Sequence, residues 1–406
     1  WIDRMIYRLS ILYFFLFLSL PSKVIGNEVF FIPPDINQAF QKIDIRDRAL
    51  HCGNVSDFFL SELEEYGNLT PPKKIEGFNS RMDNRDDVIG AEEADIFFLR
   101  LSQASTAAVF ADDEEAARIA LSGMKNWAMN DALTQTKHCY SQNGIEKSCG
   151  KAWKRKDGQD LAPTMDSGKV QAFMNHASYA YFGGLEKIDA DESTHQAISK
   201  WLRVFQSKNK GVSKPFFGFD FGWYWPAIFK NQDKGSDCFS KDCPKKLIQR
   251  LIKELDEVVL PDGSLKDRTT RGDRALHYHN EAMNEVIMTL ELARKFGVEI
   301  PNELHQKVQK SGDIFANGFF DHTYMDKWAK VAHNSKYTPG KQKFKSDINN
   351  LTYGTSWYFV FAYRYPSSTL AKKLNEMFEI GTKTAKVDVA LGIGVGCVYR
   401  ALISQN

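Results

Sequence analysis

Apolar residues recur at three- and four-residue spacing in segment after segment from residue 91 onward, as on one face of an α-helix. These segments are 91–110, 113–132, 168–182, 193–206, 244–259, 276–296, 303–317, 356–365 and 368–380. Asp113 is a candidate N-cap, and Gly297 and Pro301 are stop signals after the segment 276–296. Strand-like alternation is scarce. The pattern therefore favours a large all-α domain of antiparallel helix hairpins, and an α/α toroid is one way to close them around a groove.

The chain before residue 91 has a different character. Arg4 and Arg8 precede an apolar run at 9–20, and a small residue, Gly26, follows; this is the order of a secretory signal peptide. The run is shorter than the roughly 20 residues of a membrane-spanning helix. We expect cleavage after Gly26, a single mature domain over 27–406 without stable membrane insertion, and a secreted or periplasmic location. Residues 27–90 mix short apolar pieces with turn residues, and the polar stretch 70–87 is expected to be a surface loop.

Six cysteines fit an oxidising compartment. Cys52 and Cys397 are either a pair or two buried thiols, and four others could close two short loops: Cys139 with Cys149 and Cys238 with Cys243. No CxxC pair or His-rich motif accompanies them, so a metal site is not expected. A formal net charge of +2 is too small to indicate a nucleic-acid partner, although a local basic cluster would suit an anionic ligand.

The stretch 262–280 holds the densest group of chemically useful side chains. Asp262-Gly263-Ser264-Leu265 is followed by a ten-residue block at the entrance of a predicted helix, Arg271-Gly272-Asp273-Arg274-Ala275-Leu276-His277-Tyr278-His279-Asn280. Arg274 and Tyr278 share a face if the helix includes 274–278. Arg271 and Tyr278 share one only if the helical path extends back past Gly272. On composition alone, the favoured interpretation is that Arg271 and Arg274 are solvated and that His277 and Tyr278 pack in the core.

These residue types suit the elimination of a 4-linked uronate sugar. The reaction needs donors that neutralise the uronate carboxylate, and Arg, His and Asn provide them. It also needs a group that removes the C5 proton and a group that protonates the departing O4. A tyrosine beside a guanidinium can do both, because a nearby positive charge favours the phenolate form.

The 262–280 block resembles the hallmark of the alginate lyase family, in which a DG-x-L segment leads to R-G-x-R-A-L-x-Y-H. More diffuse similarities to that family lie at 126–133, at 72–77 with 85–87, which resembles a lid loop, and at 357–365. The resemblance implies an incomplete α/α toroid and an elimination without metal or other cofactor that leaves 4,5-unsaturated products. It also implies that Arg271 and Tyr278 are the catalytic arginine and tyrosine.

One part of the family pattern is displaced. The family uses an Asn-His pair in an N-N-H-x-Y-W context, and counting from the other blocks puts that position near 219–225, where no histidine occurs. Either an insertion shifts the alignment, or Asn175 and His176 act from a neighbouring helix, or Asp220 and other groups replace the pair. We favour Asn175 and His176 as groove residues that assist catalysis.

The remaining candidates are substrate-binding residues. Around the motif these are Arg274, His277 and His279, the last either a second acid or base or a residue that orients Tyr278. Further away, two lysines could close over a polyanion and two aromatic residues could stack on sugar rings: Lys73, Lys74, Tyr224 and Trp225.

The sequence thus predicts a monomeric polysaccharide lyase that acts on an acidic polysaccharide, with poly-β-D-mannuronate as the first choice and glucuronan or another uronan as alternatives. A glycoside hydrolase would need two carboxylic acids flanking the scissile bond, and no such pair stands out. An exported glycan-binding protein on a lyase scaffold that has lost activity is the non-enzymatic alternative.

Overall fold

The protein is described here from a computed structural model, in which residues 32–53, 55–75, 90–135, 153–154, 160–161, 173, 176–208, 243–330, 337–344, 356–379 and 394–405 are placed. Within these ranges the fold is almost entirely helical, which confirms the predicted all-α class. The strands consist of one antiparallel pair of two residues each, β1 (Trp153–Lys154) and β2 (Asp160–Leu161). No described helix is both long enough and apolar enough to cross a bilayer.

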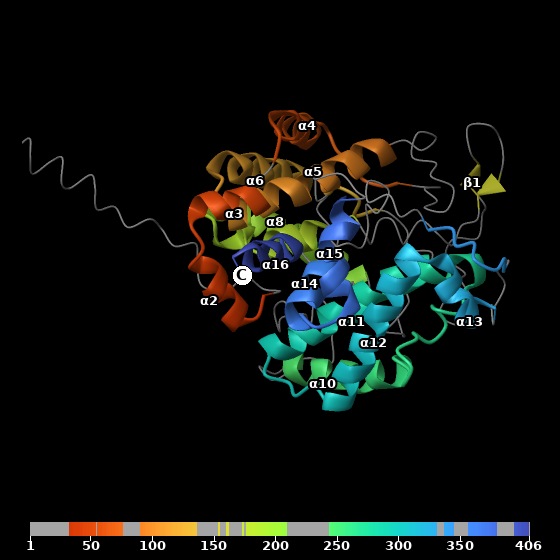
Figure 1. The fold of residues 1–406 in the computed structure, drawn as a ribbon. Helices are drawn as coiled ribbons and strands as arrows, with labels where there is room; N and C mark the ends of the chain where they lie inside the picture. Colours follow the sequence, from red (N-terminus) through yellow and green to blue (C-terminus); the bar gives the residue numbers. More distant parts are fainter. Residues whose placement is uncertain are drawn as a thin grey trace, which may run out of the picture.

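The described helices follow one another along the chain (Figure 1), with short 3-10 turns among them. The α-helices are α2 (Pro34–Gln41), α3 (Ile45–Cys52), α4 (Asp57–Asn68), α5 (Ala91–Phe110), α6 (Glu114–Met129), α8 (Glu192–Lys208), α10 (Cys243–Val258), α11 (Ala275–Lys295), α12 (Asn302–Phe320), α13 (Asp326–Ala329), α14 (Ser356–Arg364), α15 (Thr369–Glu379) and α16 (Val395–Ser404). The 3-10 turns are η3 (Leu185–Lys187), η4 (Gly272–Arg274) and η5 (His322–Met325).

Local signals account for many helix ends. The Asp113 carboxylate accepts a hydrogen bond from the backbone N–H of Ala116 at 3.0 Å, so it caps α6 as predicted. Ser56 caps α4 in the same way, through the N–H of Phe59 at 3.3 Å. Helix α11 ends just before Gly297, whose φ of +60° is the left-handed conformation that favours glycine.

The structure differs from the sequence analysis before residue 91. Residues 34–68, which show no clear helical period, form α2, α3 and α4. Two of these helices are only eight residues long, too short to repeat an apolar spacing convincingly. Helices α2 and α3 both pack on α16. The third helix, α4, packs on α6 so closely that a Cβ at Gly67 would lie 2.9 Å from the Cα of Gly123.

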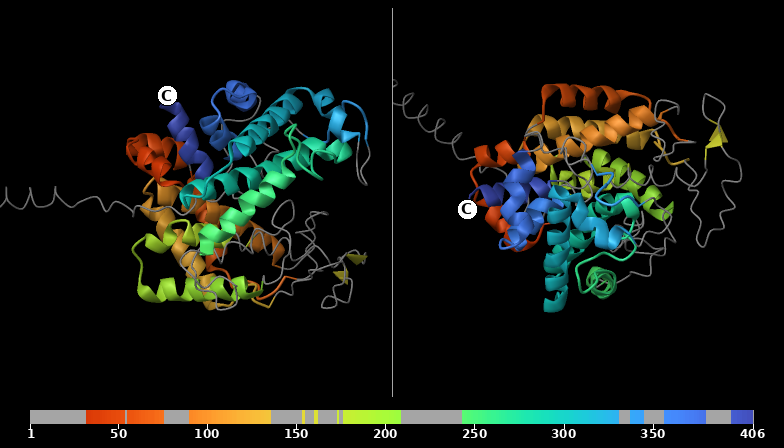
Figure 2. Two further views of the ribbon diagram at one scale, coloured as in Figure 1. Left: turned by 90° about the horizontal axis from the view of Figure 1, so that it is seen from below. Right: turned by 45° about the vertical axis from the view of Figure 1, so that its right-hand side comes forward.

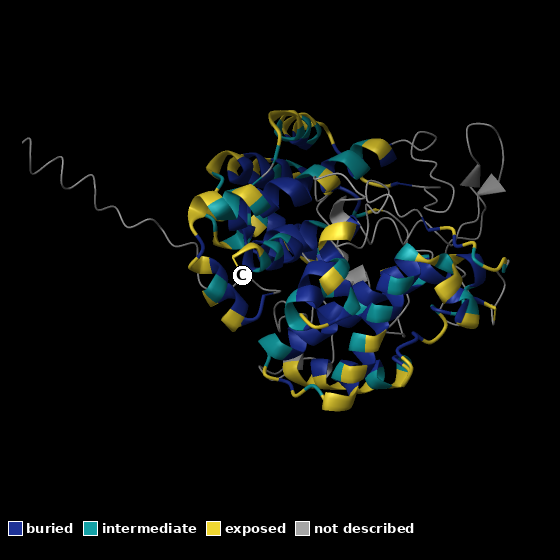
Figure 3. Ribbon diagram, viewed as in Figure 1, coloured by how far each residue is buried: buried dark blue, intermediate teal, exposed yellow. Residues whose placement is uncertain are grey.

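The helices form two neighbouring groups (Figure 2). Helices α4, α5, α6 and α8 contact one another in one group, and α10, α11, α12, α14 and α15 do so in the other. Helix α16 returns the end of the chain to the start, because it packs on α14, α3 and α2. The buried residues lie along the inner faces of both groups, and exposed residues cover the outer helix faces (Figure 3).

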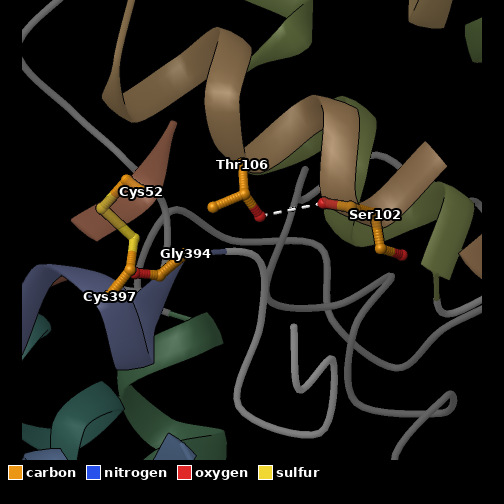
Figure 4. The surroundings of a disulfide bond; sticks show 5 residues. All are labelled: Cys52, Ser102, Thr106, Gly394 and Cys397. Carbon is orange, nitrogen blue, oxygen red and sulfur yellow. Dashed lines mark hydrogen bonds between the residues drawn. A yellow bond between two sulfur atoms is a disulfide. The ribbon is translucent and has the colours of Figure 1, made fainter. Parts of the chain in front are cut away.

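A disulfide joins the first helices to the last. Cys52 of α3 and Cys397 of α16 are bonded, with their Cα atoms 5.3 Å apart and 345 positions between them (Figure 4). The structure thus selects the paired alternative for these two cysteines. Beside the bond, Gly394 opens α16, and on α5 Thr106 donates a hydrogen bond to the carbonyl of Ser102 at 2.9 Å. Such a link restrains the unfolded chain and is typical of proteins from oxidising compartments.

Candidate functional site

A tight turn connects α10 to the predicted motif. Val259 and Leu265 form an isolated antiparallel bridge, and Asp262 holds the turn between them. Its carboxylate accepts hydrogen bonds from the N–H of Ser264 at 2.9 Å and from the indole N–H of Trp328 at 2.9 Å. Gly263 has φ +87°, and a Cβ there would lie 2.6 Å from Lys310. The Asp-Gly pair is therefore required by the backbone of this turn rather than by chemistry.

The structure brings Arg271 and Tyr278 together. Arg271 precedes η4, α11 begins at Ala275, and the positive φ of Gly272 (+58°) allows the path to turn between them. The guanidinium carbon of Arg271 lies 4.7 Å from the centre of the Tyr278 ring, and its Nε donates to the carbonyl of Asp267 at 2.8 Å. Tyr278 is partly exposed. A fixed cation thus stands over an accessible phenol ring.

A third arginine, not singled out from the sequence, belongs to the same cluster. The guanidinium carbon of Arg268 lies 5.6 Å from the Tyr278 ring centre. Burial lowers the pKa of Arg268, attraction to Glu285 opposes this, and repulsion from Arg271 lowers it further. The spacing Arg268, Arg271, Arg274 was the available signal, because residues three apart on a helical or 3-10 path lie on one side.

The other motif residues divide between the surface and the core. Arg274 is exposed at the end of η4, and His277 is partly exposed with its Nε2 3.1 Å from the Glu281 carboxylate. Asn280 is buried, and its side-chain oxygen accepts hydrogen bonds from Trp357 at 3.0 Å and from the Tyr358 hydroxyl at 2.8 Å. Arg274 and His277 are therefore accessible to a ligand, whereas Asn280 packs α11 on α14.

The expected contact of His279 with substrate does not agree with the structure. Its side chain has no exposed surface. Thr269 Oγ1 accepts from the N–H of Leu265 at 2.7 Å and lies 2.8 Å from His279 Nδ1, while His279 Nε2 lies 3.0 Å from the carbonyl of Ser311. A carbonyl can only accept, so Nε2 carries the hydrogen and Nδ1 accepts from Thr269. His279 therefore joins the 265–269 turn, α11 and α12 and is not accessible to a ligand.

This histidine predicts a pH dependence of stability. Burial lowers the pKa of His279 to about 4, from 6.5 in the unfolded chain. The unfolded chain therefore binds the proton first as pH falls, and the free energy of unfolding should decrease from about pH 6.5 down to about pH 4, by roughly 3 kcal/mol in total. Denaturation of the protein and of His279→Asn across this range measures the effect. The variant should lose that part of the slope, and an unchanged slope would contradict the prediction.

His176 lies on a different part of the fold. It lies in a helical stretch described at 176–182, and its Nδ1 lies 3.2 Å from the carbonyl of Phe98 and 3.1 Å from Ser102 Oγ, both on α5. Because the carbonyl only accepts, Nδ1 carries the hydrogen and Nε2 has the lone pair of the neutral ring. Its partner in the prediction, Asn175, lies outside the described residues.

The more distant candidates are described only in part. Lys73 and Lys74 are exposed, and the backbone at 72–73 is held by hydrogen bonds from Leu133 and Gln135 at 2.8 and 2.9 Å. Most of the expected lid loop lies outside the described residues, as do Tyr224, Trp225 and the alternative site at 219–225. Within the described part of the chain, no group of three or more His, Cys, Asp or Glu residues is arranged to hold a metal ion.

A cavity of about 730 Å³ lies elsewhere in the fold. It is lined by α8 and the stretch before it, including Tyr181, His195 and Arg203, and by none of the predicted site residues. Tyr181 and His195 already pair, with the hydroxyl 3.0 Å from Nδ1, and His195 Nε2 lies 3.2 Å from the carbonyl of Ile188. Since these groups satisfy one another, the arginine and tyrosine pair remains the better candidate site.

Part of the chain matches a family model. Residues 240–323 match the family model described as alginate lyase, and this match contains Arg271 and Tyr278. No curated protein sequence matches the chain significantly. The fold is similar to solved structures of alginate lyase A1-III.

Two of these structures are variants complexed with tetrasaccharide. One, with a histidine replaced by alanine, is 16% identical with a TM-score of 0.55, and the match covers 94% of this chain and 98% of that one. The other, with a tyrosine replaced by phenylalanine, is 16% identical with a TM-score of 0.54, covering 94% and 99%. An apo form is 17% identical with a TM-score of 0.54, covering 92% and 98%. The fold is therefore the incomplete α/α toroid that the motif implied, and the stretch 240–323 is similar to the alginate lyase family.

Proposed function

We propose that this lyase cleaves a 1,4-linked uronate polysaccharide by β-elimination, with poly-β-D-mannuronate as its first-choice substrate. The observation that carries the proposal is the Arg271 guanidinium carbon 4.7 Å from the Tyr278 ring centre, on a partly exposed turn. The preference for mannuronate rests on the resemblance of the motif to mannuronan-cleaving enzymes. Two of the A1-III structures are complexed with tetrasaccharide, which supports an oligosaccharide ligand here.

Each residue has a distinct task in this mechanism. Arg271 and the exposed Arg274 bind the uronate carboxylate, which makes the C5 proton more acidic because the charge that develops on the carboxylate is stabilised. Tyr278 removes the C5 proton. The electron pair left at C5 forms the C4–C5 double bond while the C4–O4 bond breaks, and the proton passes from Tyr278 to O4. The tyrosine is thereby returned to its starting form, with no hydride or electron transferred.

His176 and Asn175 are proposed to complete the neutralisation of the carboxylate. His176 is held on α5 through its Nδ1, which contacts Phe98 and Ser102. His277, Lys73, Lys74, Tyr224 and Trp225 are proposed to bind neighbouring sugar units. We further propose that the protein is exported as a monomer, in keeping with its Cys52–Cys397 disulfide.

A panel of four polymers tests the proposal. Elimination creates a conjugated double bond that absorbs in the far ultraviolet, so absorbance is followed with polymannuronate, polyguluronate, glucuronan and hyaluronan. The expected result is the fastest increase with polymannuronate. New reducing ends without absorbance would indicate a hydrolase. Binding without absorbance on any polymer would indicate a glycan-binding protein and would end the lyase proposal.

A further inference from the structure

A buried carboxylate lies on the turn that carries the arginines. Asp273 lies in the sequence between Arg271 and Arg274, the two residues proposed to bind uronate. Its side chain is only 10% exposed, and its Oδ2 lies 2.6 Å from Lys343 Nζ. An acidic group at this position would compete with the substrate for the neighbouring guanidinium groups if nothing else occupied it.

Lys343 is held in place independently of that ion pair. It belongs to the segment 337–344, in which Gln342 is buried and bonds to both sides of the arginine turn. The side-chain nitrogen of Gln342 donates to the carbonyl of Gly272 at 3.1 Å, and its side-chain oxygen accepts from the N–H of Leu276 at 3.1 Å. At the other end, the N–H of Gly340 donates to the Asp326 carboxylate at 2.8 Å. The segment thus presents Lys343 to Asp273 as a fixed partner.

The contacts described for Arg271 and Arg274 do not include Asp273. Arg271 donates through Nε to a backbone carbonyl, that of Asp267, and its guanidinium lies over Tyr278. Arg274 is exposed, and within the described residues its side chain makes no hydrogen bond or ion pair. Asp273 therefore takes a lysine as its partner although two arginines flank it in the chain.

We infer that Lys343 is a positioning residue for substrate binding. It forms an ion pair with the Asp273 carboxylate, so that Arg271 and Arg274 remain available to bind the uronate carboxylates. The inference rests on the proposed function. Lys343 itself need not touch the substrate. Without it, the buried Asp273 carboxylate would recruit one of the adjacent guanidinium groups, since an unpaired buried charge is costly.

Steady-state kinetics on polymannuronate test this role. Lys343→Gln is expected to raise KM about tenfold, equivalent to ~1.4 kcal/mol, with a smaller effect on kcat. The double variant Asp273→Asn/Lys343→Gln should return KM to within about twofold of the original, because the competing carboxylate is gone. Lys341→Gln removes one exposed positive charge from the same segment and is the matched control, with KM unchanged. Thermal melting of each variant records whether the fold is retained.

The outcomes separate this inference from the proposed function. An unchanged KM in Lys343→Gln, with an active parent protein, would overturn the inference alone. A raised KM that Asp273→Asn does not rescue would also overturn it, because Lys343 would then bind substrate directly or support the fold. A parent protein inactive on every polymer of the panel would overturn the proposed function and this inference with it.

Discussion

Tyr278→Phe is expected to lower kcat for polymannuronate elimination by about a thousandfold or more, because the hydroxyl is proposed to act first as base and then as acid, and each such role typically contributes about 10²–10⁴-fold. The substitution removes one oxygen and keeps the ring. The Arg271 guanidinium, 4.7 Å from the ring centre, therefore retains its aromatic neighbour. The dissociation constant for a mannuronate tetrasaccharide, measured by calorimetry, should stay within about threefold of the original value.

The control for this substitution is a tyrosine that is also accessible but lies away from the candidate site. Tyr324 of η5 is 39% exposed and lies over Lys327, outside the arginine cluster. Tyr324→Phe should therefore keep the original kcat and KM. If Tyr278→Phe retained more than about a tenth of the parent kcat, the tyrosine would not be the group that moves the proton.

Helix positions were largely predictable where apolar spacing persists over several turns. Helix α5 spans Ala91–Phe110, the same bounds that the pattern predicts, and Asp113 caps the next helix as expected. The short helices α2 and α3 gave no such signal, because eight residues complete little more than two turns. Their stability comes from contacts with distant elements, including the bond between Cys52 and Cys397, which no local pattern encodes.

The candidate site divides in the same way. Arg271 and Tyr278 are seven positions apart, and only the resemblance of the motif predicted their pairing, because Gly272, with its positive φ, interrupts the helical path between them. The burial of His279 could be predicted from the sequence, since it lies three residues after Leu276 and four before Met283, on the apolar face of α11. The ion pair of Asp273 with Lys343 could not be predicted, because 70 positions separate the two residues and only tertiary structure brings them together.

Glu291→Ala is expected to lower the free energy of unfolding by about 3–5 kcal/mol, the usual cost of breaking a buried ion pair by removing one partner. Glu291 is 3% exposed at the centre of a network that joins α11 to α14 and α16. Its carboxylate lies 2.6 Å from Arg294 Nη1 and 2.8 Å from Arg364 Nη2, and it accepts a hydrogen bond from the Tyr399 hydroxyl. Burial alone would lower the pKa of Arg364, but hydrogen bonding and attraction to Glu291 raise it overall.

Removing this carboxylate leaves Arg364 with only the longer contact to the exposed Asp35 at 3.5 Å, and it takes the carboxylate partner from Arg294 as well. The effect should therefore far exceed that of a surface pair. Glu303→Ala supplies the comparison: Glu303 is 75% exposed and 3.7 Å from Lys307, and its loss should change the free energy of unfolding by at most about 1 kcal/mol. Chemical denaturation of both variants measures the difference. Equal losses would mean that the network contributes no more than a solvated ion pair, and that α11, which carries Tyr278, is held against α14 and α16 by apolar packing alone.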